Sequence, residues 1–316
     1  MDVLTAGEAM ALLLAEDAVP LGRAERFARS VAGSESNVAI GLARLGHTVA
    51  FCGRVGADAA GGWVRDTLRA EGVDVTALHT DPRRPTGLLL RDRPAGGRPV
   101  SVAYYRTGSA ATALAPADVD EARVATARMV FVSGITAMLS PSAADFTDRL
   151  IAAASAAGVP VAFDPNVRLR LAAAEDWRRM YARFAGRMDT LLLSGEELRR
   201  LGLAPDARTD PAGLLSGRTT TVVVTHGAAG ATATTAAGTV HAAASPVSAL
   251  DPVGAGDAFT AGWLSARLRG LPPADALREA AAVAALVVAV PTDIAGLPTP
   301  AERDRLLSTG GDDVDR

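Results

Sequence analysis

The stretch DPVGAGDAFTAGW, residues 251–263, places a carboxylate directly after a run of small residues at the expected first turn of a helix. Gly254 and Gly256 leave room for backbone N–H groups to converge, and a helix from about 255 to 269 would point the positive end of its dipole at the same place. Such a cluster of N–H groups can hold an anion. Asp257 lies within it, where its carboxylate could take a proton from a hydroxyl as that oxygen attacks a phosphoryl group.

A simpler alternative exists for Asp257. A lone aspartate in the first turn of a helix commonly does no more than stabilise the helix dipole. Dipole stabilisation, however, does not require glycines around the carboxylate. The glycines on its N-terminal side therefore favour the catalytic interpretation.

Composition limits the classes of function that the 316-residue chain can perform. Apolar residues make up 49% and the net charge is −3, which is typical of a globular protein and gives no overall attraction to nucleic acid or a membrane surface. Cys52 is the single cysteine, so an internal disulfide is excluded and a reducing, cytoplasmic location is expected. The N-terminus has no basic signal segment, and the longest apolar run, 280–290, is too short to cross a bilayer.

The chain contains no lysine: all 32 basic residues are arginines. A Walker A loop, a protein-kinase strand lysine and Schiff-base chemistry are therefore excluded. GxGxxG is also absent, so the usual dinucleotide fingerprint is missing. The four histidines show no metal-ligand spacing and are interpreted as ordinary residues.

Strand and helix patterns alternate from about residue 123 onward. Apolar, β-rich runs predict strands at 127–134, 159–163, 190–194 and 220–225, and Ser140-Pro141 predicts the start of a helix that ends at Gly158. This alternation predicts a parallel sheet with helices on both faces.

The N-terminal third has a different pattern. A helix is predicted over 36–46, and β-rich segments at about 10–30 and 86–106 predict a small antiparallel sheet attached to the larger body. RPAGGRP, residues 93–99, is a turn signal inside the second segment. We expect one domain over 1–308 and a disordered tail at 309–316.

Two motifs carry a resemblance to a known family. DPVGAGDAFTAGWL, starting at 251, and AGSESNVAIGLARLG, residues 32–46, resemble the C-terminal and N-terminal signatures of the ribokinase-like (PfkB) sugar kinases, in the family's order. The resemblance runs over nearly the whole chain. It implies a three-layer α/β/α sandwich with a mostly parallel central sheet and a small β-sheet lid.

The resemblance also implies a reaction. In such a kinase Asp257 would be the general base for transfer of a phosphoryl group from ATP, and the N–H groups of Gly254, Ala255 and Gly256 would hold that group. Mg²⁺ would bridge the phosphates. No Walker lysine is needed in this family, so the lack of lysine is compatible with it.

Further nucleotide-side residues follow from the resemblance. SGEE corresponds to the family's Asn-x-x-Glu motif, with Ser194 and Glu197 influencing the metal through water, although Glu197 could equally be a solvated helix-start carboxylate. THGAAG, residues 225–230, matches the loop that lines the nucleotide in the family. Thr225, Gly227 and Gly230 of this loop, together with Gly254 and Gly256, would therefore contact ATP. The family often has lysine at the first of these positions.

The substrate side resembles the 2-keto-3-deoxygluconate branch. YYRTGSAATAL, residues 104–114, and FDPNVR, residues 163–168, correspond to segments in which Tyr104, Arg106 and Arg168 would hold the sugar. Two arginines suit an aldonic carboxylate, because a guanidinium can donate two parallel hydrogen bonds to it. Taken singly, each arginine could be a surface residue, and the tyrosine a strand residue.

Other positions match sugar contacts. Gly33, Ser34 and Asn37 would meet sugar hydroxyls, a role that is compatible with capping the helix that follows. Asp293 matches a substrate-side aspartate of the branch, and Asp251 belongs to a loop that binds a monovalent cation in the family, with K⁺ as the candidate.

Three departures affect the substrate more than the reaction. Leu89 stands where the branch often has tyrosine, Thr292 where glycine is common, and Ala32 where the first glycine of the signature is usual. A kinase of a neutral sugar, similar to fructokinase or ribokinase, therefore stays open. So does a regulator that binds sugar or nucleotide without turnover. We expect a sugar acid and ATP as ligands, no nucleic acid or membrane partner, and a dimer formed through the lid.

Overall fold

The computed structural model describes residues 1–93, 100–203, 211–247 and 250–308. The predicted tail at 309–316 and most of the predicted turn at 93–99 lie outside these residues. The strands of the described residues are β1 Val3–Gly7, β2 Met10–Ala15, β3 Phe27–Ala32, β4 Val49–Gly56, β5 Leu78–Asp81, β6 Leu88–Arg91, β7 Val102–Tyr105, β8 Met129–Ser133, β9 Val161–Asp164, β10 Thr190–Ser194, β11 Thr221–Thr225, β12 Ala231–Thr235 and β13 Gly238–Ala242. The helices are α1 Ser34–Arg44, α2 Ala59–Ala70, α3 Glu121–Ala125, α4 Gly134–Met138, α5 Pro141–Ala156, α6 Ala174–Phe184, α7 Gly195–Arg200, α8 Ala255–Leu268, α9 Pro273–Val288 and α10 Pro300–Ser308.

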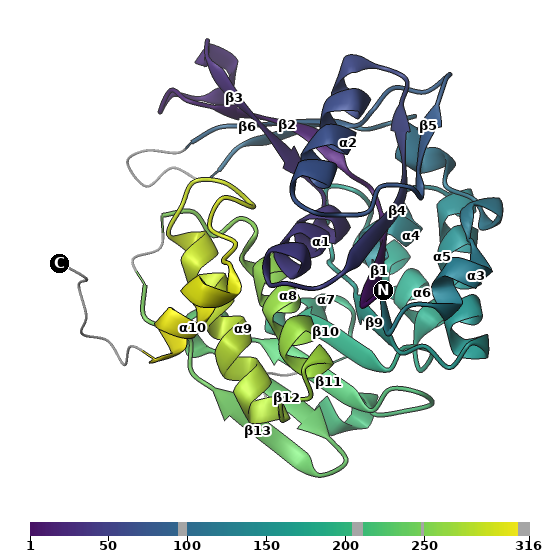
Figure 1. Cartoon of the computed structure of the whole chain (residues 1–316), viewed down its shortest axis with the longest axis vertical. Coiled ribbons are helices and arrows are strands. Elements are labelled where there is room, and N and C mark those ends of the chain that lie inside the picture. Colours follow the sequence, from purple (N-terminus) through teal and green to yellow (C-terminus); the bar gives the residue numbers. More distant parts are fainter. Residues whose placement is uncertain (94–99, 204–210, 248–249, 309–316) are drawn as a thin grey trace.

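A large, mostly parallel sheet forms the centre of the molecule (Figure 1). Its strands follow the order β13-β12-β11-β10-β9-β8-β1-β4-β5. Every pairing from β5 to β11 is parallel, whereas β12 and β13 continue the sheet as an antiparallel edge. Helices α1, α8 and α9 lie on one side of this sheet and α3 to α6 on the other. The predicted three-layer α/β/α architecture is confirmed.

Two hydrophobic cores fill the spaces between the layers because strand residues alternate between the faces. In β8, Phe131 packs into the core that contains α1, α8 and α9, while Val130 and Val132 pack into the core with α5 and α6. Trp263 of α8 is buried in the first core and Trp177 of α6 in the second. Both faces of the strands are thus buried, as their continuous apolar runs predict.

A second, smaller sheet forms the lid, which we define as β3-β2-β6-β7. Its strands lie in the two predicted segments, except that β3 continues to Ala32. The pairs β2–β3 and β6–β7 are antiparallel, as predicted, whereas β2 and β6 pair in parallel. The parallel pair is possible because these two strands are far apart in the chain and no hairpin joins them.

Helix boundaries agree closely with the predicted ones near the two signature motifs. Helix α8 covers Ala255–Leu268, and α1 begins at Ser34, two residues earlier than predicted. The earlier start follows from Gly33, whose φ of 137° is accessible to glycine and lets the chain turn sharply into the helix. Among the described residues, no helix is long and apolar enough to span a membrane.

Candidate active site

A cavity of about 860 Å³ lies between the large sheet and the lid. Strands β9, β10 and β11 end at its floor with Asp164, Ser194 and Thr225, and the lid contributes residues such as Leu89 and Tyr104. Ligands of open parallel sheets bind in the crevice outside the carboxyl ends of the strands, which is where this cavity lies.

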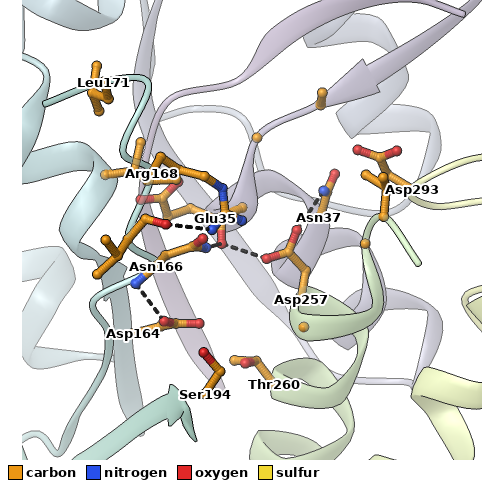
Figure 2. A pocket seen from close by; sticks show the side chains of 18 of the residues that line it. Glu35, Asn37, Asp164, Asn166, Arg168, Leu171, Ser194, Asp257, Thr260 and Asp293 are labelled. Atoms are coloured by element: carbon orange, nitrogen blue, oxygen red, sulfur yellow. Dashed lines mark hydrogen bonds between the residues drawn. The ribbon is translucent and has the colours of Figure 1, made fainter. Parts of the chain in front are cut away.

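Asp257 lies in the first turn of α8 and is held from the side by α1 (Figure 2). Its Oδ1 accepts a hydrogen bond from Ser34 Oγ at 2.6 Å, and its Oδ2 accepts one from Asn37 Nδ2 at 2.8 Å. Burial raises the pKa of Asp257 above its usual value, although the two hydrogen bonds and the positive charge of Arg168 oppose that rise. The carboxylate is therefore both oriented and more basic than an exposed aspartate.

Ser34 is itself oriented by a residue that the sequence interpretation missed. Asn166 Nδ2 donates to Ser34 Oγ at 2.7 Å, so the serine hydroxyl is free to donate to Asp257. Asn166 has a φ of 48°, the only positive value among the described residues other than glycine, and its backbone N–H donates to Asp164 Oδ1 at 2.8 Å. Asparagine tolerates this left-handed conformation, so its place in FDPNVR was the available signal.

The two glycines before Asp257 lie in different surroundings, so glycine is needed at the two positions for different reasons. Gly254 is the N-cap of α8 with a φ of 84°, and a Cβ there would lie 2.8 Å from the carbonyl oxygen of Asp293. Gly256 has open space where a Cβ would be. Both line the cavity, whereas Ala255 is not among its lining residues. Close backbone packing explains Gly254, and open access to the helix N-terminus explains Gly256.

Glu197 caps the start of α7 from a buried position. Its Oε2 accepts hydrogen bonds from the Ser194 backbone N–H at 2.7 Å and the Ser194 hydroxyl at 2.8 Å, and its Oε1 accepts one from the Val167 N–H at 2.7 Å. The residue caps a helix, as one alternative expected, but it is 9% exposed and not solvated. The same carboxylate fixes the backbone next to Arg168.

Carboxyl groups cluster on the side of the cavity where β9 and β10 end and α8 begins. Burial raises the pKa of Asp164 well above its usual value, and the nearby carboxylates of Glu197 and Asp257 raise it further. Within the described ranges, no three acidic, histidine or cysteine side chains form a group that could hold a metal ion by themselves. A cation here would thus need ligands from a bound molecule or water.

The two predicted substrate arginines are in different electrostatic states. Arg106 pairs with the buried carboxylate of Glu8 and lies 5.7 Å over the ring of Tyr104. Arg168 forms no ion pair with any described carboxylate, and its Nη1 donates a hydrogen bond to the Val167 carbonyl at 3.2 Å. Figure 2 shows its side chain reaching into the cavity. Its guanidinium can therefore meet a ligand in the cavity, although its charge also acts on the nearby Asp257.

Asp251 and Asp293 are joined by a residue that sequence reasoning did not single out. Arg91 of β6 donates from Nη1 to Asp293 Oδ1 at 2.5 Å, and its Nη2 lies 3.1 Å from Asp251 Oδ2. Burial raises the pKa of Asp293 to about 6 despite the opposing charge of Arg91. Asp293 lines the cavity, and Asp251 lies outside its lining.

A model described as the pfkB family carbohydrate kinase matches residues 2–300. The chain belongs to this family. It is 35% identical to the 2-dehydro-3-deoxygluconokinase of Bacillus subtilis (strain 168), over 98% of this chain and 95% of that protein. It is also 35% identical to a fructokinase of Klebsiella pneumoniae, over 79% and 80% of the two chains. The crystal structure of a PfkB protein from Polaromonas sp. JS666 matches with a TM-score of 0.86 at 37% identity, covering 96% of this chain and 99% of that one.

The structure brings most of the predicted site residues of this pfkB kinase together. Those that line the cavity are Gly33, Ser34, Asn37, Tyr104, Arg106, Arg168, Ser194, Glu197, Thr225, Gly254, Gly256, Asp257 and Asp293. Gly227 and Gly230, predicted to contact ATP, lie in the turn between β11 and β12 and do not line it. Glu8, Glu35 and Asp164 line it without having been predicted.

Proposed function

We propose that this carbohydrate kinase transfers the terminal phosphoryl group of ATP to the primary hydroxyl of 2-keto-3-deoxygluconate, giving 2-keto-3-deoxy-6-phosphogluconate. The observation that carries the substrate class is Arg168, a guanidinium inside the cavity without a carboxylate partner among the described residues. A sugar acid supplies that partner, and a neutral sugar does not. The similarity to a 2-dehydro-3-deoxygluconokinase supports the same choice.

The chemistry follows from the position of Asp257. A substrate hydroxyl within hydrogen-bond reach of this carboxylate gives up its proton to Asp257 as its oxygen bonds to the terminal phosphorus of ATP and the bond from that phosphorus to the bridging oxygen breaks. Ser34 and Asn37 hold the base in one orientation. The N–H groups at the start of α8 stabilise the negative charge of the transferring phosphoryl group.

Mg²⁺ would bind on the side of the cavity that contains Asp164 and Glu197. When bound with ATP, it would neutralise charge on the phosphate oxygens. Asp164 and Glu197 would lie near it, because burial and the carboxylates of Glu197 and Asp257 already raise the pKa of Asp164, which indicates crowded negative charge that a cation would relieve. Since Glu197 uses both oxygens to hold Ser194 and Val167, it would act on the metal through water.

The proposal is tested with a panel of sugar acids and neutral ketoses in a coupled ADP-release assay. Removing a hydrogen bond to a charged group costs about 1.5–3 kcal/mol, so Arg168→Gln should raise KM for the acid by about 10- to 150-fold. KM for a neutral ketose should not change. Arg199→Gln is the matched control, because Arg199 is exposed on α7 and does not line the cavity.

A neutral sugar is the second candidate substrate, and one contact favours it. Arg106 is already paired with Glu8, so only one of the two expected arginines is free to meet a carboxylate. The similarity to a fructokinase agrees with this alternative. Two results together would make a neutral sugar the substrate. The enzyme would turn over fructose faster than every sugar acid, and Arg168→Gln would lower the activity with both kinds of sugar equally.

A further inference from the structure

Arg91 is one of the most deeply buried charged residues of the described chain. Its side chain is 1% exposed, although it comes from a strand of the lid. Along β6 the side chains alternate, so that Leu89 and Arg91 are buried and Leu88 and Leu90 are partly exposed. Arg91 therefore points inward, toward the C-terminal part of the chain, and carries its charge into the body of the molecule.

Arg91 forms an ion pair with the loop that leads into α8. Its Nη2 lies 3.1 Å from Asp251 Oδ2, while Asp251 Oδ1 accepts a hydrogen bond from the Val253 N–H at 3.0 Å. The backbone N–H of Asp251 donates to the Val288 carbonyl at the end of α9. Both oxygens of Asp251 thus have protein partners, and the loop is fixed at its first residue.

Arg91 also forms hydrogen bonds with the segment that contains Pro291 and Asp293, after α9. It donates to Asp293 Oδ1 at 2.5 Å and to the Pro291 carbonyl at 3.1 Å. The backbone of Asp293 packs directly against Gly254, where a Cβ would lie 2.8 Å from its carbonyl oxygen. One guanidinium consequently holds both chain segments that position the N-cap of α8.

We propose that the Arg91 guanidinium is a built-in cation that positions the phosphate-binding start of α8, so that this kinase needs no loose monovalent cation at Asp251. The sequence resemblance implied a K⁺ loop there, but the residues do not fit a free ion, because Asp251 Oδ2 is already paired with Arg91 and Asp251 Oδ1 accepts a hydrogen bond from the Val253 N–H. Arg91 is a positioning residue and acts through Asp251 and Asp293. The inference rests on the proposed kinase activity but not on the identity of the sugar.

The test compares the wild type, Arg91→Ala and Arg91→Lys in K⁺ and in tetramethylammonium at equal ionic strength, with and without millimolar guanidinium. Two measurements are made: kcat with ATP and the best sugar of the panel, and the midpoint of thermal unfolding. Arg54→Ala is the matched control. Arg54 also lies between two buried carboxylates, those of Asp81 and Asp118, but does not line the cavity.

The wild type should show the same unfolding midpoint in both salts and a kcat that differs by less than about twofold between them. Because misplacing reacting groups by about 1 Å can cost 10²-fold, Arg91→Ala should lose about 100-fold in kcat. Guanidinium or K⁺ should restore at least about fivefold of that loss and raise the midpoint of this variant. Arg91→Lys should lose less, and Arg54→Ala should unfold earlier without any rescue of rate by cations.

Three results would overturn the proposal: stimulation of the wild type by K⁺ beyond about fivefold, a wild-type kcat in Arg91→Ala, or no rescue of a folded Arg91→Ala by either cation. If Arg91→Ala does not fold, the salt dependence of the wild type decides alone. If no sugar is phosphorylated, the proposed function fails, while the effect of K⁺ on the wild-type and Arg91→Ala unfolding midpoints still tests the built-in cation.

Discussion

Replacing Asp257 by asparagine separates catalysis from structure in this kinase. The amide cannot take a proton from the sugar hydroxyl, yet it has nearly the same size. Asp257 accepts hydrogen bonds from Ser34 and Asn37. The new amide can still accept from Ser34, and the Asn37 side chain can turn over to accept from it, because Asn37 Oδ1 is buried without a hydrogen-bond partner among the described residues.

The expected loss of turnover follows from the role of the base. Positioned general bases contribute about 10²- to 10⁴-fold, so Asp257→Asn should lower kcat by about 10³-fold, or about 4 kcal/mol of transition-state stabilisation. The stability of the fold should not fall with the turnover. The folded state raises the pKa of Asp257, so it disfavours the ionised carboxylate relative to the unfolded chain at neutral pH. Removing that charge should leave the unfolding free energy unchanged or higher.

Coupled ADP release gives kcat, calorimetry gives the affinities for sugar and ATP, and thermal unfolding gives the stability of Asp257→Asn. Asp275→Asn is the matched control, since Asp275 lies in the first turn of α9 and outside the cavity. It should lower stability by about 0.3–1 kcal/mol and leave kcat unchanged. If Asp257→Asn behaved like Asp275→Asn, keeping turnover and losing only stability, Asp257 would be a dipole-stabilising residue and the assignment of the base would be refuted.

Two further predictions concern the same site. Asp257 must be deprotonated to act as a base and burial raises its pKa, so kcat should fall as the pH drops through that raised pKa. Ser34→Ala removes a hydrogen bond that lowers this pKa, so it should shift the acid limb of the kcat profile to higher pH. Gly254→Ala should destabilise the fold by about 1–2 kcal/mol through left-handed strain and should also lower kcat, because its Cβ would displace Asp293. Gly270→Ala is the control: Gly270 has a φ of 82° and open space around the added Cβ, so this variant should lose stability but keep its kcat. If the two variants had equal kcat values, Gly254 would have no role in positioning the anion site.

The part of the large sheet from β8 to β11 could be predicted because these strands are buried on both faces and most are separated by helix signals, whereas β1, β4, β5, β12 and β13 were not predicted. Ser140 caps α5 with a side-chain hydrogen bond and Pro141 follows it, which are local features that need no knowledge of the rest of the chain. Register and strand order are not local. The parallel pairing of β2 with β6 depends on how two distant segments meet, and neither segment contains a signal for its direction.

The site residues that could be predicted are those whose function demands an unusual sequence. Gly254 and Asp257 belong to such a motif, and the structure shows why the first must be glycine. The missed residues look ordinary in the sequence. Asn166 acts through Ser34, 132 residues away, and Arg91 acts through Asp293, 202 residues away. An arginine at the end of a lid strand resembles any surface arginine until its partners are known.

The absence of lysine and the burial of Arg91 have a common physical consequence. A lysine between Asp251 and Asp293 would also carry a positive charge, but its compact ammonium group has no planar fork with which to meet both carboxylates in a fixed geometry. A guanidinium stays charged in such a place, and its planar group reaches both carboxylates at the same time. Several carboxylates of the cavity have raised pKa values: burial raises the pKa of Asp257, the proposed base, and burial and neighbouring negative charge raise those of Asp164, Asp293 and Glu35; burial also raises the pKa of Glu8. A change in rate between neutral and mildly acidic pH therefore reports on these acids and not on loss of a cation.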